Sequence, residues 1–226
     1  MPDARTVWLY REGLAQAGVV EALFQQFDGY LARRGYIARG GQILDASIVP
    51  VPRNHNTRDE NKAIKAGDLP EGWADKPAKR SQKDTDARWS EEDQKTVRGT
   101  VFPTSTHGKS HYGYKNHVNV DRAHKLVRRY HVSDAALHDS QAVDHLLTRG
   151  NTRCGVWAGR QSCANGSSNI GDAYRSEELE AKLHGRGLKS RIHRKGKCGK
   201  PPTEQGKGSN RTKSTVRVRV EQALLQ

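Results

Sequence analysis

The chain has 226 residues, enough for one domain of ordinary size with an irregular extension. Only 34% of the residues are hydrophobic, and 39 Lys and Arg outnumber 25 Asp and Glu, which gives a formal net charge of +14. Such an excess favours polyanionic partners, above all nucleic acid, because each neutralised phosphate releases a condensed counterion. No stretch reaches the roughly 18 to 20 apolar residues that cross a bilayer, which excludes a membrane-spanning class.

The N-terminus and the cysteines predict a protein of the reducing cytoplasm. MPDARTVWLYREGLAQAG lacks the uninterrupted apolar run of a signal peptide. Cys154, Cys163 and Cys198 form no C-x-x-C pair and leave an odd thiol, so neither a disulfide framework nor a zinc finger is expected.

The first elements along the chain are helical and then extended. Apolar residues recur at helical spacing over 7–38, which predicts a short helical segment within residues 1–40. GGQILDASIVPVP then predicts a strand at 42–49, bounded by glycines and a proline. Residues 41–226 are expected to form the main domain.

Residues 50–110 lack a periodic apolar pattern and are rich in Pro, Asn, Lys and Asp. We expect a long, irregular, basic insertion whose cations clamp DNA. Trp73 and Trp89 have two interpretations: packing the loop down, which is commoner, or stacking on an unpaired base.

Regular structure is expected to resume after this segment. Strand-like stretches at 112–121 and 126–133 predict a hairpin, followed by a helix capped by Asp139 or Ser140. A short strand at 155–158, a helix opened by Ser176 and a strand at 188–193 follow. This order predicts an α/β domain with a mixed sheet flanked by helices.

Three features have more than one interpretation from their residues alone. Asp45 lies inside a predicted strand, where Asp is depleted, so it is either a functional carboxylate or a strand residue facing solvent. VRVRVEQALLQ fits a strand by alternation and one helical face by spacing. Residues 186–219 carry 12 Lys or Arg and one acid, and form either a solvated loop or a phosphate-tracking surface.

Several segments together resemble one family. GGQILDASIV, GKSHYGYKNHVNVDRAHKLVRRYHVSDAALHDSQAVDHLL, DAYRSEELEAKL and STVRVRVEQ occur in the order found in the insertion-sequence-five family of bacterial DDE transposases. The likeness covers most of residues 5–222. It implies a ribonuclease-H-like fold, here in a shortened and degenerate copy.

The resemblance also implies a catalytic set. Asp45 in ILDAS, Asp172 in GDAYRS and Glu221 in RVRVEQ match the family's three carboxylates. Such carboxylates hold two Mg²⁺ (or Mn²⁺) ions roughly 3.5–4 Å apart for phosphodiester chemistry. The sequence departs from the family at GRQSCANGSSNIG, which precedes Asp172, and at Ser214, where the family has Tyr.

DNA contacts are expected from basic residues around this set. The candidates are Lys115, His117, Arg191, Arg194, Lys195, Lys197 and Arg217.

The function implied is cleavage at the element's terminal inverted repeats and strand transfer into target DNA. It would be carried out by a homo-oligomer in the bacterial cytoplasm, associated with the nucleoid. Two alternatives remain open at this point: a catalytically inactive DNA-binding remnant, and a nuclease that cuts without joining.

Overall fold

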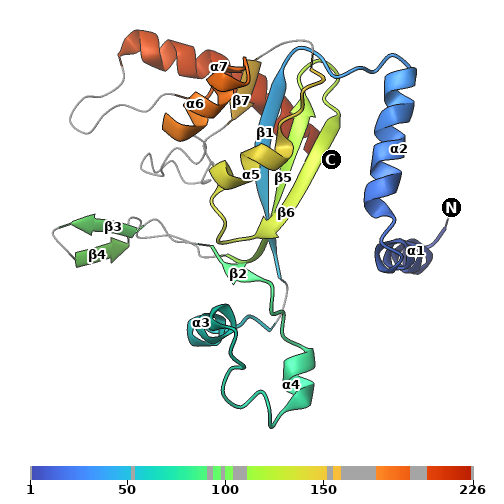
Figure 1. The fold of residues 1–226 in the computed structure, drawn as a ribbon, viewed down its shortest axis with the longest axis vertical. Helices are drawn as coiled ribbons and strands as arrows, with labels where there is room; N and C mark the ends of the chain where they lie inside the picture. Colours follow the sequence, from blue (N-terminus) through green and yellow to red (C-terminus); the bar gives the residue numbers. More distant parts are fainter. Residues whose placement is uncertain are drawn as a thin grey trace.

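The computed structural model describes residues 2–51, 54–90, 111–151, 155–158, 177–193 and 203–216, and the backbone alone of 94–97, 100–103 and 217–224. Within these ranges the chain forms a mixed α/β structure around a six-stranded sheet (Figure 1). The expectation of a mixed sheet flanked by helices is therefore confirmed.

The sheet is built around one long central strand. The strand order is β2-β5-β1-β7-β8, and β6 also pairs with β5. β1 runs antiparallel to β5 and parallel to β7, while β5 and β6 form the predicted hairpin. The strands are β1 (Gln42–Pro50), β2 (Arg88–Trp89), β5 (Tyr112–Asp121), β6 (Val127–Asp134), β7 (Gly155–Ala158) and β8 (Lys189–Ser190).

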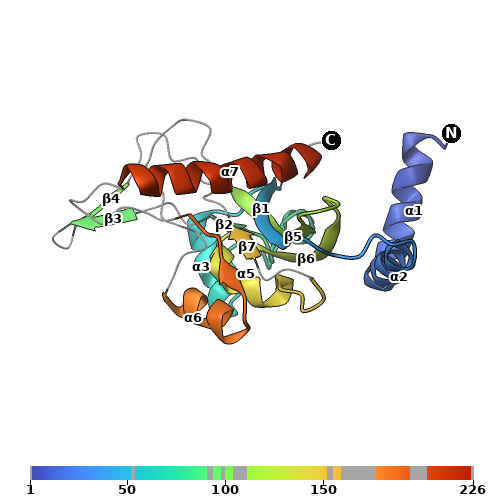
Figure 2. The ribbon, with the colours of Figure 1, turned by 90° about the horizontal axis from the view of Figure 1, so that it is seen from above.

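Helices cover both faces of this sheet, as Figure 2 shows from above. On one face lie α5 (Asp139–Leu146) and α6 (Glu177–Gly185), and on the other lies α7 (Glu204–Leu224). Successive side chains of a strand point to opposite faces, so β1 contributes to both layers. Leu44 belongs to the α5 and α6 layer, whereas Ile43 belongs to the α7 layer.

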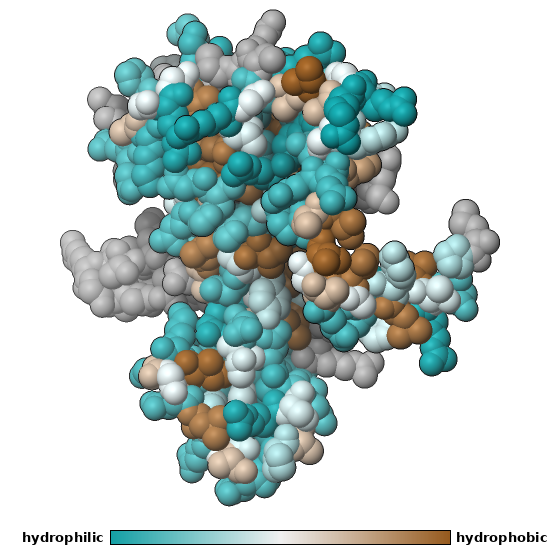
Figure 3. Space-filling model, turned by 45° about the vertical axis from the view of Figure 1, so that its right-hand side comes forward, coloured by the Kyte–Doolittle hydropathy of each residue, from teal (hydrophilic) through white to brown (hydrophobic). Residues whose placement is uncertain are grey.

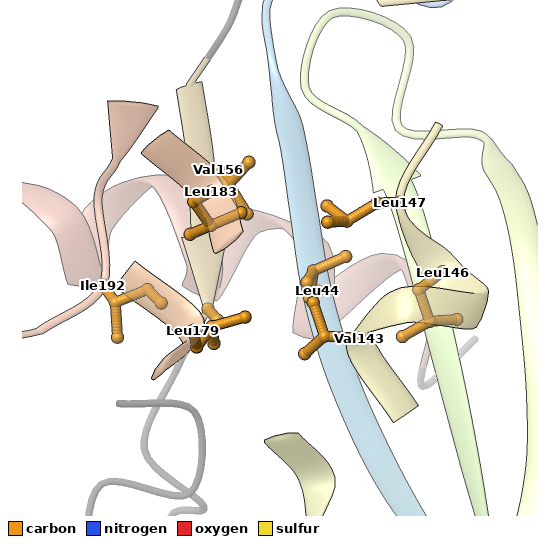
Figure 4. Close-up of a cluster of buried hydrophobic side chains, with 9 residues drawn as sticks. Leu44, Val143, Leu146, Leu147, Val156, Leu179, Leu183 and Ile192 are labelled. Carbon is orange, nitrogen blue, oxygen red and sulfur yellow. The ribbon is translucent and has the colours of Figure 1, made fainter. Parts of the chain in front are cut away.

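The larger core cluster lies under α5 and α6 (Figure 4). In α5, Val143 and Leu146 are fully buried and Leu147 follows the helix. Leu179 and Leu183 of α6, one helical turn apart, complete the contact with the sheet. This cluster fixes both helices on one face.

A smaller cluster supports α7. Ile43, Val118 and Val120 are buried on the other face, and Val216 of α7 packs against them with Trp157. The Trp157 ring fills the space above Gly41 and Gly155, where an added Cβ would overlap it. Gly41 also has φ +107°, a conformation that favours glycine.

The N-terminal segment forms α1 (Ala4–Gln16) and α2 (Val20–Arg33), which have no buried residue. Arg128, buried in β6, joins α2 to the sheet by donating to Asp28 (2.7 Å), Asp121 (3.1 Å) and the Tyr36 carbonyl oxygen (2.6 Å). The exposed apolar side chains of these helices form brown patches on the lobe at the right of Figure 3.

Residues 54–90 form a small folded lobe, so the expectation of an irregular segment is wrong there. It contains α3 (Arg58–Ala66) and α4 (Pro77–Ser81), and Trp73 is 1% exposed. Thr57 and Glu60 form a capping box at the start of α3. Trp73 and Trp89 donate to Glu60 and to the Asn56 carbonyl oxygen, so both pack within the lobe.

Further along the same stretch, β3 (Gln94–Val97) and β4 (Thr100–Pro103) form a hairpin.

Two local expectations need correction. The N-cap of α5 is His138, whose ring accepts from the Ser140 backbone N–H, rather than Asp139 or Ser140. Residues 204–219 of the basic stretch are helical, so the solvated-loop interpretation is wrong there. Across the part of the chain that the structure describes, no helix is long and apolar enough to cross a membrane.

Candidate active site

Asp45 lies on the sheet face that α7 crosses. In β1 it is opposite Val118 of β5 and shares a face with Ile43, two residues earlier. Its side chain is half-buried, and its Oδ1 accepts from the Ala46 backbone N–H at 3.1 Å. Leu44 pairs with Ala158, so Asp45 stands one residue beyond the level of the last β7 residue. The carboxylate is therefore at the carboxyl end of the parallel pair.

The backbone of α7 carries Glu221 past this face. Val216 is anchored on the cluster that contains Ile43, and Glu221 follows five residues later in the same helix. Five residues of α-helix rise about 7.5 Å. The choice left open for VRVRVEQALLQ is thus settled as helix through Leu224, and the side chain of Glu221 lies outside the described residues.

The remaining members of the predicted set are placed in part. Asp172, Arg194, Lys195 and Lys197 lie outside the described residues, as does the side chain of Arg217. Among the side chains that are described, no three His, Cys, Asp or Glu come together in a metal-binding arrangement. The structure therefore places Asp45 on the sheet face that the helix carrying Glu221 crosses.

A polar contact that sequence reasoning missed holds α7 in place. His193, buried after β8, lies 2.9 Å from Ser214 Oγ and 3.1 Å from the Asn210 carbonyl oxygen through its Nε2. Lys213 donates to the Ile192 carbonyl oxygen at 2.8 Å. Ser214 stands where the resemblance predicts Tyr, and its hydroxyl links the helix to the segment that follows β8.

Lys115 lies on the opposite face of the sheet from Asp45. It is 8% exposed, and its Nζ lies 3.1 Å from Asp139 and donates to the Leu137 carbonyl oxygen at 2.7 Å. The cation is therefore enclosed between β5 and the start of α5. Contact between Lys115 and a phosphate would require α5 to move.

His117 lies on the same α5 face and is fully buried. Its Nε2 is 2.9 Å from Ser133 Oγ, and its ring stacks near His131, which stacks in turn on His145 at 4.4 Å. Burial, together with Lys115 and His131, lowers the pKa of His117 to about 4, although Asp139 opposes the shift. The ring is consequently neutral at pH 7 and part of the packing.

Arg191 is exposed and lines a groove between α7 and the β7–β8 edge of the sheet. It is the one predicted DNA contact whose described side chain is both solvent-accessible and on the α7 side. This placement is compatible with a phosphate contact.

A family model described as a transposase DDE domain matches residues 37–224, a range that contains β1 with Asp45 and the whole of α7. No curated protein and no solved structure matches the chain.

Proposed function

The chain belongs to the transposase DDE domain family, and on that premise we propose that it cleaves DNA and transfers the resulting 3′-hydroxyl ends into a target. We also propose a ribonuclease-H-like fold, membership of the insertion-sequence-five type, recognition of terminal inverted repeats, and function as a homo-oligomer.

The observation that supports the proposal best is the position of Asp45. Asp has a low propensity for strands, and a carboxylate placed in a strand loses part of its hydration. The presence of Asp45 in β1 therefore favours a functional role. It stands at the carboxyl end of the parallel β1–β7 pair, on the face crossed by α7. A carboxylate that follows β7 and one from α7 would approach it from two sides.

Asp45, Asp172 and Glu221 are the residues that would hold two Mg²⁺ or Mn²⁺ ions. The half-buried carboxylate of Asp45 fits this role because Mg²⁺ prefers hard oxygen ligands and keeps several of its waters. Bound divalent ions activate the attacking oxygen and stabilise the departing one. The chain itself would supply the ligand geometry and, through basic residues such as Arg191, the position of the DNA backbone.

The experiment that tests the proposal compares the wild-type protein with an Asp45→Asn variant. Cleavage of supercoiled plasmid and of end-bearing DNA is followed with and without Mg²⁺, and joined products are scored separately. Asp75→Asn makes the same chemical change at an exposed site in the 54–90 lobe and serves as the control.

We expect Mg²⁺-dependent cleavage and joining that Asp45→Asn lowers by about 100-fold or more and Asp75→Asn leaves intact. Cleavage without joining would indicate a nuclease. Salt-sensitive DNA binding by the wild type without any cleavage would overturn the catalytic proposal in favour of a DNA-binding remnant.

A further inference from the structure

A basic groove of about 860 Å³ lies between α7 and the β7–β8 edge of the sheet. Its lining contains no Asp or Glu among the described residues, and its floor includes Trp157 and Gly155. The cations come from four separate segments of the chain. They are Arg122, Arg149, Arg186, Lys189, Arg191 and Lys213.

Two of these cations, Arg122 and Arg186, are positioned by contacts with other side chains of the protein. The Arg122 guanidinium lies over the Trp157 ring at 5.0 Å, which orients it without neutralising it. Arg186 is paired with Asp144 at 2.9 Å and contributes less. Arg149, Lys189 and Arg191 are exposed. A lining with this balance favours a ligand that carries several negative charges in a row.

The groove is offset along the sheet from Asp45. In the parallel β1–β7 pair, Gln42 lies opposite Val156, so Gly41 lies level with Gly155. Gly41 precedes Asp45 by four residues along the chain. Four strand residues span about 13 Å. The Gly155 end of the groove, where Lys189 pairs with Gly155, is therefore separate from a two-metal site whose ions lie roughly 3.5–4 Å apart.

The groove and Asp45 nevertheless lie on the same face of the sheet, the face that α7 crosses. Trp157, in the groove floor, pairs with Ile43, which shares its face with Asp45. Duplex DNA advances about 3.4 Å along its axis for each base pair. A duplex that lies along β1 would therefore cover about 13 Å in about four base pairs.

We propose that this groove binds the phosphate backbone of the DNA that flanks the cleavage point, about four base pairs from the scissile phosphate. The inference rests on the proposed function for the position of the scissile phosphate, but binding in the groove is separable from catalysis. The contacts are to phosphates rather than to bases, because cations dominate the lining and two of its other polar side chains are engaged by the protein: the Asn151 amide bonds the Gly41 backbone and the Thr212 hydroxyl donates to the Gly208 carbonyl oxygen.

The test replaces the three exposed groove cations together, as Arg149→Gln, Lys189→Gln and Arg191→Gln. The control replaces three exposed arginines of α1 and α2, at the other edge of the sheet (Figure 1), as Arg5→Gln, Arg11→Gln and Arg33→Gln. Both triple variants lose the same net charge, so a difference between them reports position rather than total charge.

The first readout is equilibrium binding of duplex DNA across a salt series, with every protein carrying Asp45→Asn so that cleavage does not interfere. Each phosphate contact contributes about 0.9 to the slope of log K against log salt. We expect the groove variant to reduce that slope by about 2 to 3 and the control by less than about 1. An unchanged slope in the groove variant, or an equal reduction in the control, would overturn the inference.

The second readout locates the contact. Duplexes that carry one neutral methylphosphonate at successive positions are bound by the protein, and cleavage is mapped on unmodified DNA. One methylphosphonate position should weaken DNA binding by the protein with an intact groove but not by the groove variant. That position should lie about four base pairs from the cleavage point. A slope change without wild-type cleavage would support the groove and contradict the proposed catalysis; cleavage with no groove effect would do the reverse.

Discussion

The carboxylate of Glu60 connects most of the 54–90 lobe, and its replacement provides a quantitative test of that structure. Its oxygens accept from Trp73 Nε1 at 3.0 Å, Lys79 Nζ at 3.2 Å and Lys83 Nζ at 3.3 Å, and from the Thr57 backbone N–H at 2.9 Å. The side chain is 13% exposed. Asp84 is a second centre of this kind, since its carboxylate accepts from the Tyr114 hydroxyl and the Ala87 backbone N–H, so we expect part of the stability of the lobe to depend on the ionised form of Glu60.

The size of the effect follows from the pKa of Glu60. Burial opposes ionisation, but the hydrogen bonds from Thr57, Trp73, Lys79 and Lys83 outweigh it and lower the pKa from 4.5 to about 2. A difference of about 2.5 pKa units corresponds to about 3 kcal/mol of stabilisation. Lys79 is 45% exposed and its attraction is screened by solvent, so we expect about 2 kcal/mol.

The pH dependence has a definite sign. A lowered carboxylate pKa stabilises the folded state fully above 4.5, and this stabilisation is lost as the pH falls towards 2. Glu60→Gln removes the charge while keeping an acceptor for Trp73 and a residue suited to the capping box. The variant should therefore be about 2 kcal/mol less stable at neutral pH and equal to the wild type near pH 2.

The assay is hydrogen exchange of the α3 amides, followed by mass spectrometry over this pH range in both proteins. The exposed Glu71→Gln makes the same chemical change in the same lobe and should have little effect. A difference between wild type and Glu60→Gln that does not change with pH, or that is equal for Glu71→Gln, would refute the reasoning.

Three further predictions concern the core of the sheet. Burial lowers the pKa of His117 to about 4, so between pH 6.5 and 4 the folded chain binds fewer protons than the unfolded chain. The free energy of unfolding of the wild type should therefore decrease as the pH falls from 6.5 to 4. The midpoints of urea unfolding should fall less over this range in His117→Gln. Arg128→Met would leave Asp121 buried without its cation and should cost about 3–5 kcal/mol in urea unfolding, whereas the exposed Arg129→Met should cost less than about 0.5 kcal/mol. Leu146→Ala, at a site with no exposure, should lower the free energy of unfolding by about 2–5 kcal/mol in the same assay.

The strands of the central sheet were predictable because their signals are local. The strand predicted at 42–49 is β1, and the stretches at 112–121 and 126–133 are the antiparallel pair β5 and β6. β-branched residues between glycine, proline and turn residues are enough to predict such elements. The capping box of α3 is a local signal that the expectation of an irregular segment overlooked, since Thr57 and Glu60 have the required spacing.

Contacts between distant segments were not predictable in the same way. Arg128 bonds Asp28, which is 100 residues away, and lies at the register shift between the Asn119–Arg129 and Val120–Val127 pairs. VRVRVEQALLQ is helical, and its Val216 packs against the cluster that contains Ile43, more than 170 residues earlier in the chain. One sequence contains no record of such pairings, since they arise only when separate elements meet.

The alternation of β1 explains why the predicted site residues separated into two groups. On one face of the sheet, Leu44 packs against α5 and α6. Lys115 and His117 lie on the same face and are buried beneath these helices. On the other face, Ile43 supports α7 while Asp45, two residues later, stays half-exposed beside it. A buried face can hold charge only if the charge is paired, as Lys115 is with Asp139. Exposed cations such as Arg149, Lys189 and Arg191 instead line the groove beside α7, where a phosphate backbone can reach them.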